Sequence, residues 1–172
     1  LINLGFDVRN YNLHLLPGTE MDSQESRDSF FKKIGWRLHA NSYGIYDGEK
    51  VFEGQEVVRQ TSTLSIEDFR YCRFYHFLQQ MMWSKRWYYD LLVFLKNEFF
   101  HPVDVIDKII QKCKNDDGEI GQLYVDFMND YDQAESFETY EELEEFWSKD
   151  ANFNRLSDGN YGKLNMLYTY KI

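Results

Sequence analysis

The chain has 172 residues, 18% of them aromatic, and a formal net charge of −10 at pH 7. This charge argues against non-specific nucleic-acid binding, which needs Lys and Arg to displace phosphate counterions, and against binding to an anionic membrane surface. No apolar run approaches the roughly 20 residues of a membrane-spanning helix, and two isolated cysteines give no disulfide framework, so we expect a cytoplasmic protein without a membrane span.

The first predicted elements form one β/α step. Leu4–Asp7 is typical of the end of a helix. Residues 8–16 are typical of a strand, which the Pro17-Gly18 turn closes. A helix is then expected from Asp22 to about Ile34, with Gly35 at its stop. Such a step belongs to a parallel sheet or barrel, but one step cannot make a barrel. Because the chain opens on a leucine, we expect a fragment or a processed product.

The middle and carboxyl-terminal parts predict a short strand, a hairpin and then helices only. Trp36–His39 alternates apolar and polar residues, and Asp47-Gly48 is a hairpin signal. Helices are expected at residues 66–83, 85–99, 103–115, 119–134, 139–149 and 160–171. The predicted fold is mainly α with a small α/β part: the remnant of a partial β/α barrel, one strand plus a hairpin, in residues 1–62, and a multi-helix domain in residues 63–172.

Three stretches carry a family resemblance. They are Leu15–Met21, which reads Leu-Leu-Pro-Gly-Thr-Glu-Met; Tyr43–Gly48 with the Val51–Glu53 and Glu56–Val58 segments behind it; and Thr61–Phe69. In order and spacing they resemble the radical S-adenosylmethionine enzymes, in particular the group with a cobalamin-binding domain ahead of the radical domain. A further, weaker similarity to this family lies near Asn165. The resemblance covers residues 1–95 well and implies that the chain is the carboxyl-terminal portion of such an iron–sulfur oxidoreductase-like protein.

The resemblance implies cofactors for a parent protein rather than for this chain. The parent would cleave S-adenosylmethionine at a four-iron cluster to a 5′-deoxyadenosyl radical and, if it binds cobalamin, transfer a methyl group. The family holds its cluster with Cys-x-x-x-Cys-x-x-Cys, whereas this chain has only Cys72 and Cys113. We therefore expect no catalytic residue, metal or cofactor in the fragment itself. Its expected partners are the upstream domains of the same polypeptide and the parent's small-molecule substrate.

The strand 8–16 is the predicted binding element of the parent. Tyr11, Leu13 and Leu15 share one face and are expected to pack beneath helices, while Asn10, Asn12 and His14 share the other. Barrel chemistry gathers at the carboxyl ends of strands, and the resemblance implies that this strand end helps to wall the S-adenosylmethionine pocket. The predicted cofactor contacts are Asn12, His14, Leu16, Pro17, Gly18 and Thr19. The alternative is an edge strand with one solvated face.

The remaining polar and aromatic clusters have plainer interpretations. His76 lies one helical turn after Cys72, but two ligands are too few for a zinc site, so a core or interface histidine is expected. Residues 116–150 hold thirteen acidic side chains and one basic one, Lys149. Apolar residues from Phe137 to Trp147 keep helical spacing there, which predicts a helix docked by its apolar face.

Three alternatives stay open beside these interpretations. The acidic stretch is either a solubilising surface or a surface for a basic partner, and the whole chain is alternatively a stand-alone acidic helical interaction module. The aromatic run of residues 83–89 suits core packing or a lid. Arg37 and Arg86 are two cations that could pair with an anionic substrate.

Overall fold

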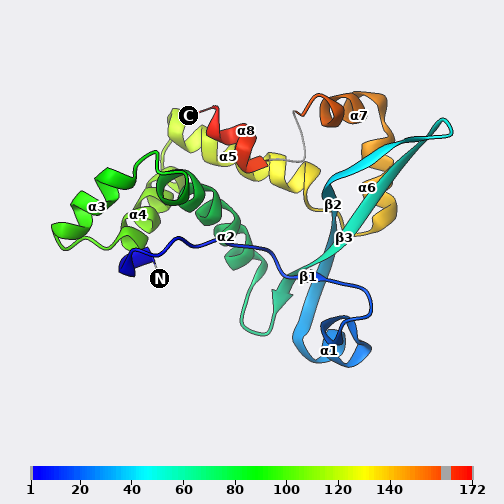
Figure 1. Ribbon diagram of the computed structural model, residues 1–172, viewed down its shortest axis with the longest axis horizontal. Helices are drawn as coiled ribbons and strands as arrows, with labels where there is room; N and C mark the ends of the chain where they lie inside the picture. Colours follow the sequence, from blue (N-terminus) through cyan, green and yellow to red (C-terminus); the bar gives the residue numbers. More distant parts are fainter. Residues whose placement is uncertain (1, 160–163, 172) are drawn as a thin grey trace. The chain divides into compact units, whose positions relative to one another are not determined.

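The computed structural model describes residues 2–159 and 164–171, which form eight α-helices and a three-stranded antiparallel sheet (Figure 1). Helices and turns make up every element after residue 65, apart from one isolated bridge at Phe137. The mainly helical prediction is therefore confirmed. No helix within the described ranges is both long and apolar enough to cross a bilayer.

The chain divides into two compact units that are interleaved in sequence. One unit consists of Leu1–Tyr11 and Arg70–Met128, and the other of Asn12–Phe69 and Asn129–Ile172. Two of the three dividing points fall inside the helices α2 (Ile66–Gln79) and α5 (Glu119–Ala134), and the third lies between Tyr11 and Asn12. The residues of the predicted carboxyl-terminal domain are thus shared between both units, and the predicted boundary after residue 62 stays a prediction.

The sheet lies in the second unit and has the strand order β1-β3-β2. Its strands are β1 (His14–Leu15), β2 (Phe31–Tyr46) and β3 (Glu49–Thr61). The predicted hairpin is confirmed: Asp47 and Gly48 have φ values of 51° and 88°, the left-handed conformation that a two-residue hairpin turn demands. The strands flanking this turn are longer than predicted, because residues on both sides of it continue the pairing.

The prediction of a barrel remnant is not confirmed. β1 runs antiparallel to β3, with His14 paired to Val57, whereas a β/α step would give a parallel strand. The predicted helix to Ile34 also ends early: α1 spans Gln24–Phe30, and Phe31 already starts β2. Residues 31–34 are strand because β3 offers them a pairing edge, which local helical periodicity does not reveal.

The start of α1 also differs from the prediction. The N-cap is Ser23, whose Oγ accepts a hydrogen bond from the Ser26 N–H. Asp22 ends the 3₁₀ turn η2 (Glu20–Asp22) and forms an ion pair with Arg27 instead of capping. Arg27 also pairs with Glu56 of β3, so this carboxylate network holds α1 against the sheet.

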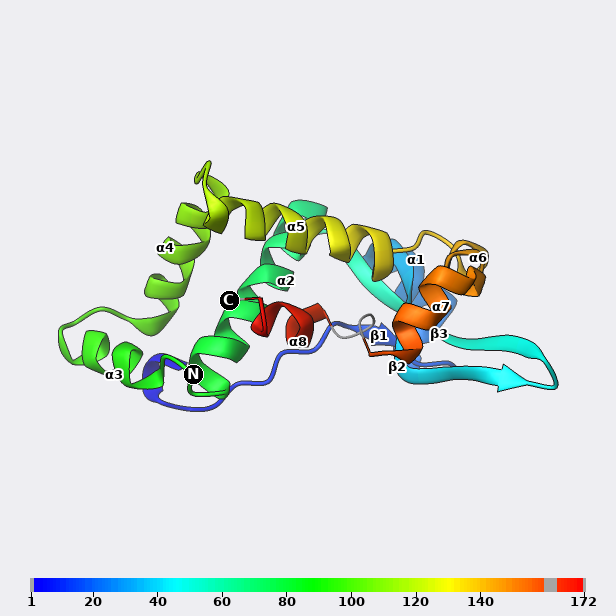
Figure 2. The same cartoon turned by 90° about the horizontal axis from the view of Figure 1, so that it is seen from above.

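The core of the second unit lies between the β2–β3 hairpin and the helices α6 (Tyr140–Ser148) and α7 (Asp150–Ser157). Figures 1 and 2 both show these two helices beside the hairpin, whose tip extends past them. The buried cluster consists of Leu38, Phe52, Ala134, Phe137, Leu143, Trp147, Phe153 and Leu156. The predicted docking of the acidic helix by its apolar face is confirmed, because Leu143 and Trp147 of α6 are fully buried.

The first unit is a helical assembly around buried aromatic rings. It contains the 3₁₀ turn η1 (Ile2–Leu4), most of α2, the π-helical turn η3 (Gln80–Ser84), α3 (Tyr89–Asn97), α4 (Pro102–Lys114) and the first part of α5. Phe74 and Phe127 are fully buried with their ring centroids 5.2 Å apart. Pro102 occupies the first turn of α4, where its missing N–H costs nothing.

The carboxyl-terminal end differs in part from the prediction. α7 was not expected, and α8 spans Leu164–Thr169 within the predicted helix of residues 160–171. Residues 160–163 of that predicted helix lie outside the described residues. Tyr168 of α8 is fully buried and donates a hydrogen bond of 2.7 Å to Asp130, which ties α8 to the end of α5.

Candidate functional site

The predicted binding residues separate into an exposed turn and a partly buried strand. Leu16, Pro17, Gly18 and Thr19 are exposed, whereas Asn12 and His14 are partly buried. The turn satisfies its own polar groups: the Thr19 hydroxyl donates to Leu16 O at 2.8 Å, and the Gly18 N–H donates to Asp22 Oδ2 at 3.2 Å. These bonds make a self-contained turn, and among the predicted residues His14 is the one that meets further polar side chains.

The apolar face of the same strand is only partly covered. Leu15 is 3% exposed, but Tyr11 is 77% and Leu13 is 43% exposed. β1 stands at the edge of its sheet, as in the alternative interpretation of this segment. The burial predicted for Tyr11 and Leu13 concerned the parent protein, and it stays a prediction.

Strand pairing brings His14 onto the same face as Arg37. Val57 of β3 is paired with His14 on one side and with Gly35 on the other. Directly opposite residues share a face, and so do residues two apart on one strand, so Arg37 follows Gly35 on the face of His14. His39 comes next, where the pairing of β2 with β3 is interrupted between Leu38 and Tyr43.

Two buried nitrogen atoms on this face have no hydrogen-bond partner. They are Nε2 of His14 and Nε of Arg37. Within the described part of the chain, neither side chain makes a hydrogen bond or an ion pair. His39 is exposed, and its Nδ1 lies 2.6 Å from the Ser42 hydroxyl. Because nearly all buried polar groups in folded proteins are satisfied, two neighbouring exceptions indicate a place where something else binds.

The electrostatic surroundings of His14 are positive. Burial lowers the pKa of His14 below its usual value, and the charges of Arg37 and His39 lower it further. Among the described residues no carboxylate acts on His14 in the opposite direction. Glu56, the neighbour of Val57 on β3, faces the other side of the sheet and is held by Arg27.

A second arginine near this face is fully engaged. Arg59 is 4% exposed and donates hydrogen bonds to the carbonyl oxygens of Phe137 and Trp36, the latter at 3.2 Å. Its guanidinium fills the space beside Gly35, where an added Cβ would lie 2.0 Å from the Arg59 Cζ. Gly35, predicted as a helix stop, is therefore a strand residue that makes room for this arginine.

The titratable residues of the first unit suit a structural role. The hydroxyl of Tyr71 on α2 donates to Asp107 of α4 at 2.5 Å, and burial together with this carboxylate raises the tyrosine pKa. Burial lowers the pKa of His76 to about 4, with a smaller contribution from Arg73, so this histidine is neutral at pH 7. The predicted core or interface role of His76 agrees with this burial.

The cysteines do not form a cluster site. Cys72 is partly buried on α2 and Cys113 is buried on α4, and burial raises the pKa of the Cys113 thiol. Within residues 2–159 and 164–171, no group of three or more His, Cys, Asp or Glu side chains is arranged to hold a metal ion. The cluster that the family resemblance implies therefore does not fit the residues of this chain.

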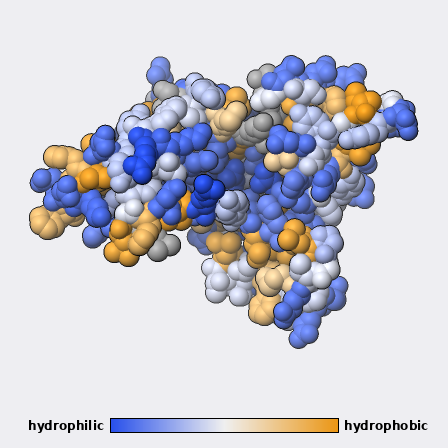
Figure 3. Space-filling view, in the orientation of Figure 1, coloured by the Kyte–Doolittle hydropathy of each residue, from blue (hydrophilic) through white to orange (hydrophobic). Residues whose placement is uncertain are grey.

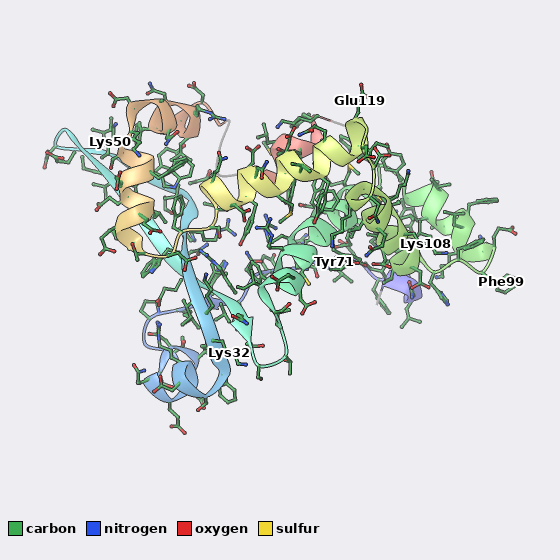
Figure 4. The ribbon with its side chains drawn as sticks, turned by 180° about the vertical axis from the view of Figure 1, so that it is seen from behind. Lys32, Lys50, Tyr71, Phe99, Lys108 and Glu119 are labelled. Atoms are coloured by element: carbon green, nitrogen blue, oxygen red, sulfur yellow. The ribbon has the colours of Figure 1, made fainter. Side chains whose placement is uncertain are left out.

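Large apolar side chains gather on the surface of the first unit. Figure 3 shows hydrophobic residues over α3 and the loop that follows it, and Figure 4 labels Phe99 in that loop. The exposed side chains there include Trp87 at 51%, Leu91 at 50%, Phe94 at 58% and Phe99 at 93%. Of the predicted aromatic run, Trp83 is buried and donates to Phe6 O, while Trp87 and Tyr88 are exposed. An apolar surface of this kind marks a contact region.

Sequence reasoning found His14 but not its neighbours. The sequence indicates Arg37 only as a cation that could pair with an anionic substrate, and it gives His39 no role. The alternation of Gly35, Arg37 and His39 in a strand was a usable signal, but it points to His14 only once β1 is known to pair with β3. No known protein family, curated protein or solved structure matches this chain.

Proposed function

We propose that the chain is the carboxyl-terminal portion of a radical S-adenosylmethionine protein of the cobalamin-binding group, in which it covers the mouth of a β/α barrel that precedes it. The chain is not catalytic alone in this proposal. The parent's upstream domains would supply the four-iron cluster and most of the S-adenosylmethionine site. This chain would shape access for the small-molecule substrate.

The observation that carries the proposal is the exposure of apolar side chains on the segment that resembles the family. Tyr11, Leu13 and Leu16 are 77%, 43% and 61% exposed, although the sequence pattern there is that of a strand packed in a barrel. Leu13 and Leu16 belong to the same unit and are exposed apolar residues close together in sequence, and such residues favour a surface that another domain buries. An upstream barrel of the same polypeptide is the occupant we propose for it.

The apolar surface of α3 gives independent support. Leu91 and Phe94 lie three residues apart on α3, Trp87 lies in the bend just before it, and each of the three is at least half exposed. Such a stripe on a helix normally faces a partner. In the proposed parent, these side chains would also contact the preceding domains.

The test begins with the coding sequence upstream of Leu1. A Cys-x-x-x-Cys-x-x-Cys motif in the same reading frame is expected within the preceding few hundred residues. The extended protein, purified and reconstituted without oxygen, should then bind a four-iron cluster and release 5′-deoxyadenosine from S-adenosylmethionine. Hydrogen exchange of residues 4–16 should be slower in the extended protein than in this chain. An upstream frame without the cysteine motif, or unchanged exchange, would contradict the proposal.

A second candidate function is an acidic interaction module that acts alone. It is favoured by α6, on which Glu141, Glu142, Glu144 and Glu145 are all exposed while the apolar face is used in the chain's own core. Only the acidic face of α6 is therefore available to a partner, which would have to be basic. A start codon directly before Leu1, together with salt-sensitive binding of a basic protein, would favour this candidate.

A further inference from the structure

We propose that His14, Arg37 and His39 form a binding site for a small oxyanion, a carboxylate or phosphate-like group, on one face of the β1-β3-β2 sheet. The site is built by strand pairing within the second unit. It does not depend on the relationship to radical enzymes, because all three side chains belong to this chain.

The geometry supplies the first step of the argument. His14 on β1 and Gly35 on β2 flank Val57 of β3, and Arg37 is the next residue on that face of β2. The pairing therefore fixes an imidazole and a guanidinium on one face of one sheet. Strand backbones hold such groups more precisely than loops do.

Buried nitrogen atoms without a hydrogen-bond partner supply the second step. They are Nε of Arg37, which is a donor, and Nε2 of His14, which is a donor when the ring carries its proton there. Leaving a buried donor unpaired costs about 1–3 kcal/mol, so two neighbouring cases in one site need a compensating ligand or water. The planar guanidinium matches the two oxygens of a carboxylate or phosphate, which makes an oxyanion the fitting ligand.

Charge supplies the third step. The chain carries a net charge of −10, so its overall field repels anions. His14 nevertheless has the Arg37 guanidinium and the His39 ring as neighbours, and no carboxylate acts on it within the described residues. Two further charged groups belong to this face. Arg59 is engaged with Glu138 and two carbonyls, and Glu53 is an exposed carboxylate two residues beyond Gln55, the partner of Arg37. A guanidinium without an ion-pair partner beside a histidine is the local feature of this acidic protein that would attract an anion.

The experiment uses sulfate as the probe, because sulfate keeps its double charge across the pH range of interest. The chain has four histidines, so their ring proton signals can be followed individually by NMR during titration with sodium sulfate. Sodium chloride at equal ionic strength is the reference. Sulfate should shift the His14 and His39 signals in a saturable way and raise the pH midpoint of His14. The His76 and His101 signals should stay unchanged.

Three variants separate the site from general effects of charge and salt. Arg37→Gln removes the guanidinium and should weaken sulfate binding by about tenfold or more, as expected for a charge-assisted hydrogen bond. Lys32→Gln removes one positive charge from the same strand, at an exposed residue that makes no hydrogen bond or ion pair within the described part of the chain, and should leave the binding unchanged. Arg37→Lys keeps the charge without the planar fork and should bind sulfate with intermediate strength.

The carboxylate arm of the experiment repeats the titration with sodium acetate. Saturable shifts with sulfate or with acetate support an oxyanion site and show which geometry it prefers. If neither anion shifts the His14 ring signals beyond the chloride reference, water satisfies the unpartnered nitrogen atoms of His14 and Arg37, and the proposal is wrong. Equal losses in Lys32→Gln and Arg37→Gln would also overturn it, since binding would then follow net charge alone. The test is independent of the upstream sequence, so its failure leaves the proposed radical-enzyme relationship untouched.

Discussion

Arg59 and Arg37 belong to neighbouring strands of one sheet but have opposite hydrogen-bonding states. Arg59 is almost fully buried, and its guanidinium donates to the carbonyls of Phe137 and Trp36 and lies 3.5 Å from Glu138. Arg37 is only partly buried, yet its Nε is inaccessible and unpaired. Satisfied donors stabilise the fold that contains them, whereas a buried donor without a partner costs free energy that a bound ligand or water can recover. Hydrogen bonding, more than burial, therefore separates a structural arginine from a binding one.

The partner of Arg59 explains why the difference arises. Phe137 forms an isolated antiparallel bridge with Trp36, with N···O distances of 2.7 and 3.0 Å in the two directions. This bridge brings a carbonyl from the segment between α5 and α6 to the edge of β2, where Arg59 can reach it. Nothing equivalent reaches Arg37 within the described residues.

The largest expected effect is that of Arg59→Ala. The variant removes two hydrogen bonds that a buried guanidinium donates, although each carbonyl keeps its backbone donor from the Trp36–Phe137 bridge, and we expect a loss of about 3 kcal/mol in the free energy of unfolding. Urea denaturation measures it. Lys33→Ala is the matched control, because Lys33 also pairs with Glu138, at 2.9 Å, but is exposed and should contribute at most about 1 kcal/mol. Equal losses in both variants would contradict the assignment of Arg59 as the structural arginine.

The next effect tests the space beside Gly35. A methyl group there would lie 2.0 Å from the Arg59 Cζ, so Gly35→Ala should cost about 1–3 kcal/mol by displacing the guanidinium. The same substitution in the Arg59→Ala background should cost clearly less, because the displaced group is gone. Additive costs in the double variant would show that the two residues are not coupled.

A smaller effect concerns pH and compares two histidines. Burial lowers the pKa of His76 to about 4 and lowers that of His14 in the same direction, from the usual value of 6.5. Between these values the unfolded chain binds more protons, so the stability contributed by the neutral histidines is present above about pH 6.5 and declines as the pH falls toward 4.

His76→Gln should flatten this decline more than His14→Gln does. Urea midpoints at pH 7.5 and pH 5 would measure the difference, since carboxylates remain mostly ionised over that interval. If the urea midpoint of His76→Gln falls between pH 7.5 and pH 5 as much as that of the wild type, other groups control the acid sensitivity.

The smallest expected effect is that of Arg37→Gln on stability. Because Arg37 makes no hydrogen bond or ion pair in the described part of the chain, its loss should change the free energy of unfolding by no more than about 0.5 kcal/mol. The same variant should lose the sulfate response of His14. A large destabilisation would remove the contrast with Arg59 and would identify Arg37 as structural too.

Local chemistry predicted much of the helical part of this chain. Pro102 at the start of α4 and the periodic run of α5 were sufficient to locate both helices, and α5 has the predicted bounds of residues 119–134. Ser65 and Asp68 cap α2 reciprocally, as their spacing indicates. Asp47-Gly48 likewise determined its hairpin, because few other residue pairs adopt two left-handed conformations in succession. These features depend on residues a few positions apart, which the sequence displays directly.

Tertiary structure decided the features that depend on distant partners. Residues 31–34 are strand because β3 pairs with them, and β1 is antiparallel because it joins the same strand. Gly35 is required by the side chain of Arg59, which lies 24 positions later in the sequence. The grouping of His14 with Arg37 arises from pairing across β3 and from no local pattern. Sequence alone thus determined the hairpin turn and most of the helices after residue 65. The candidate site was decided by the register between strands, since register depends on free energy gained from both partners at once.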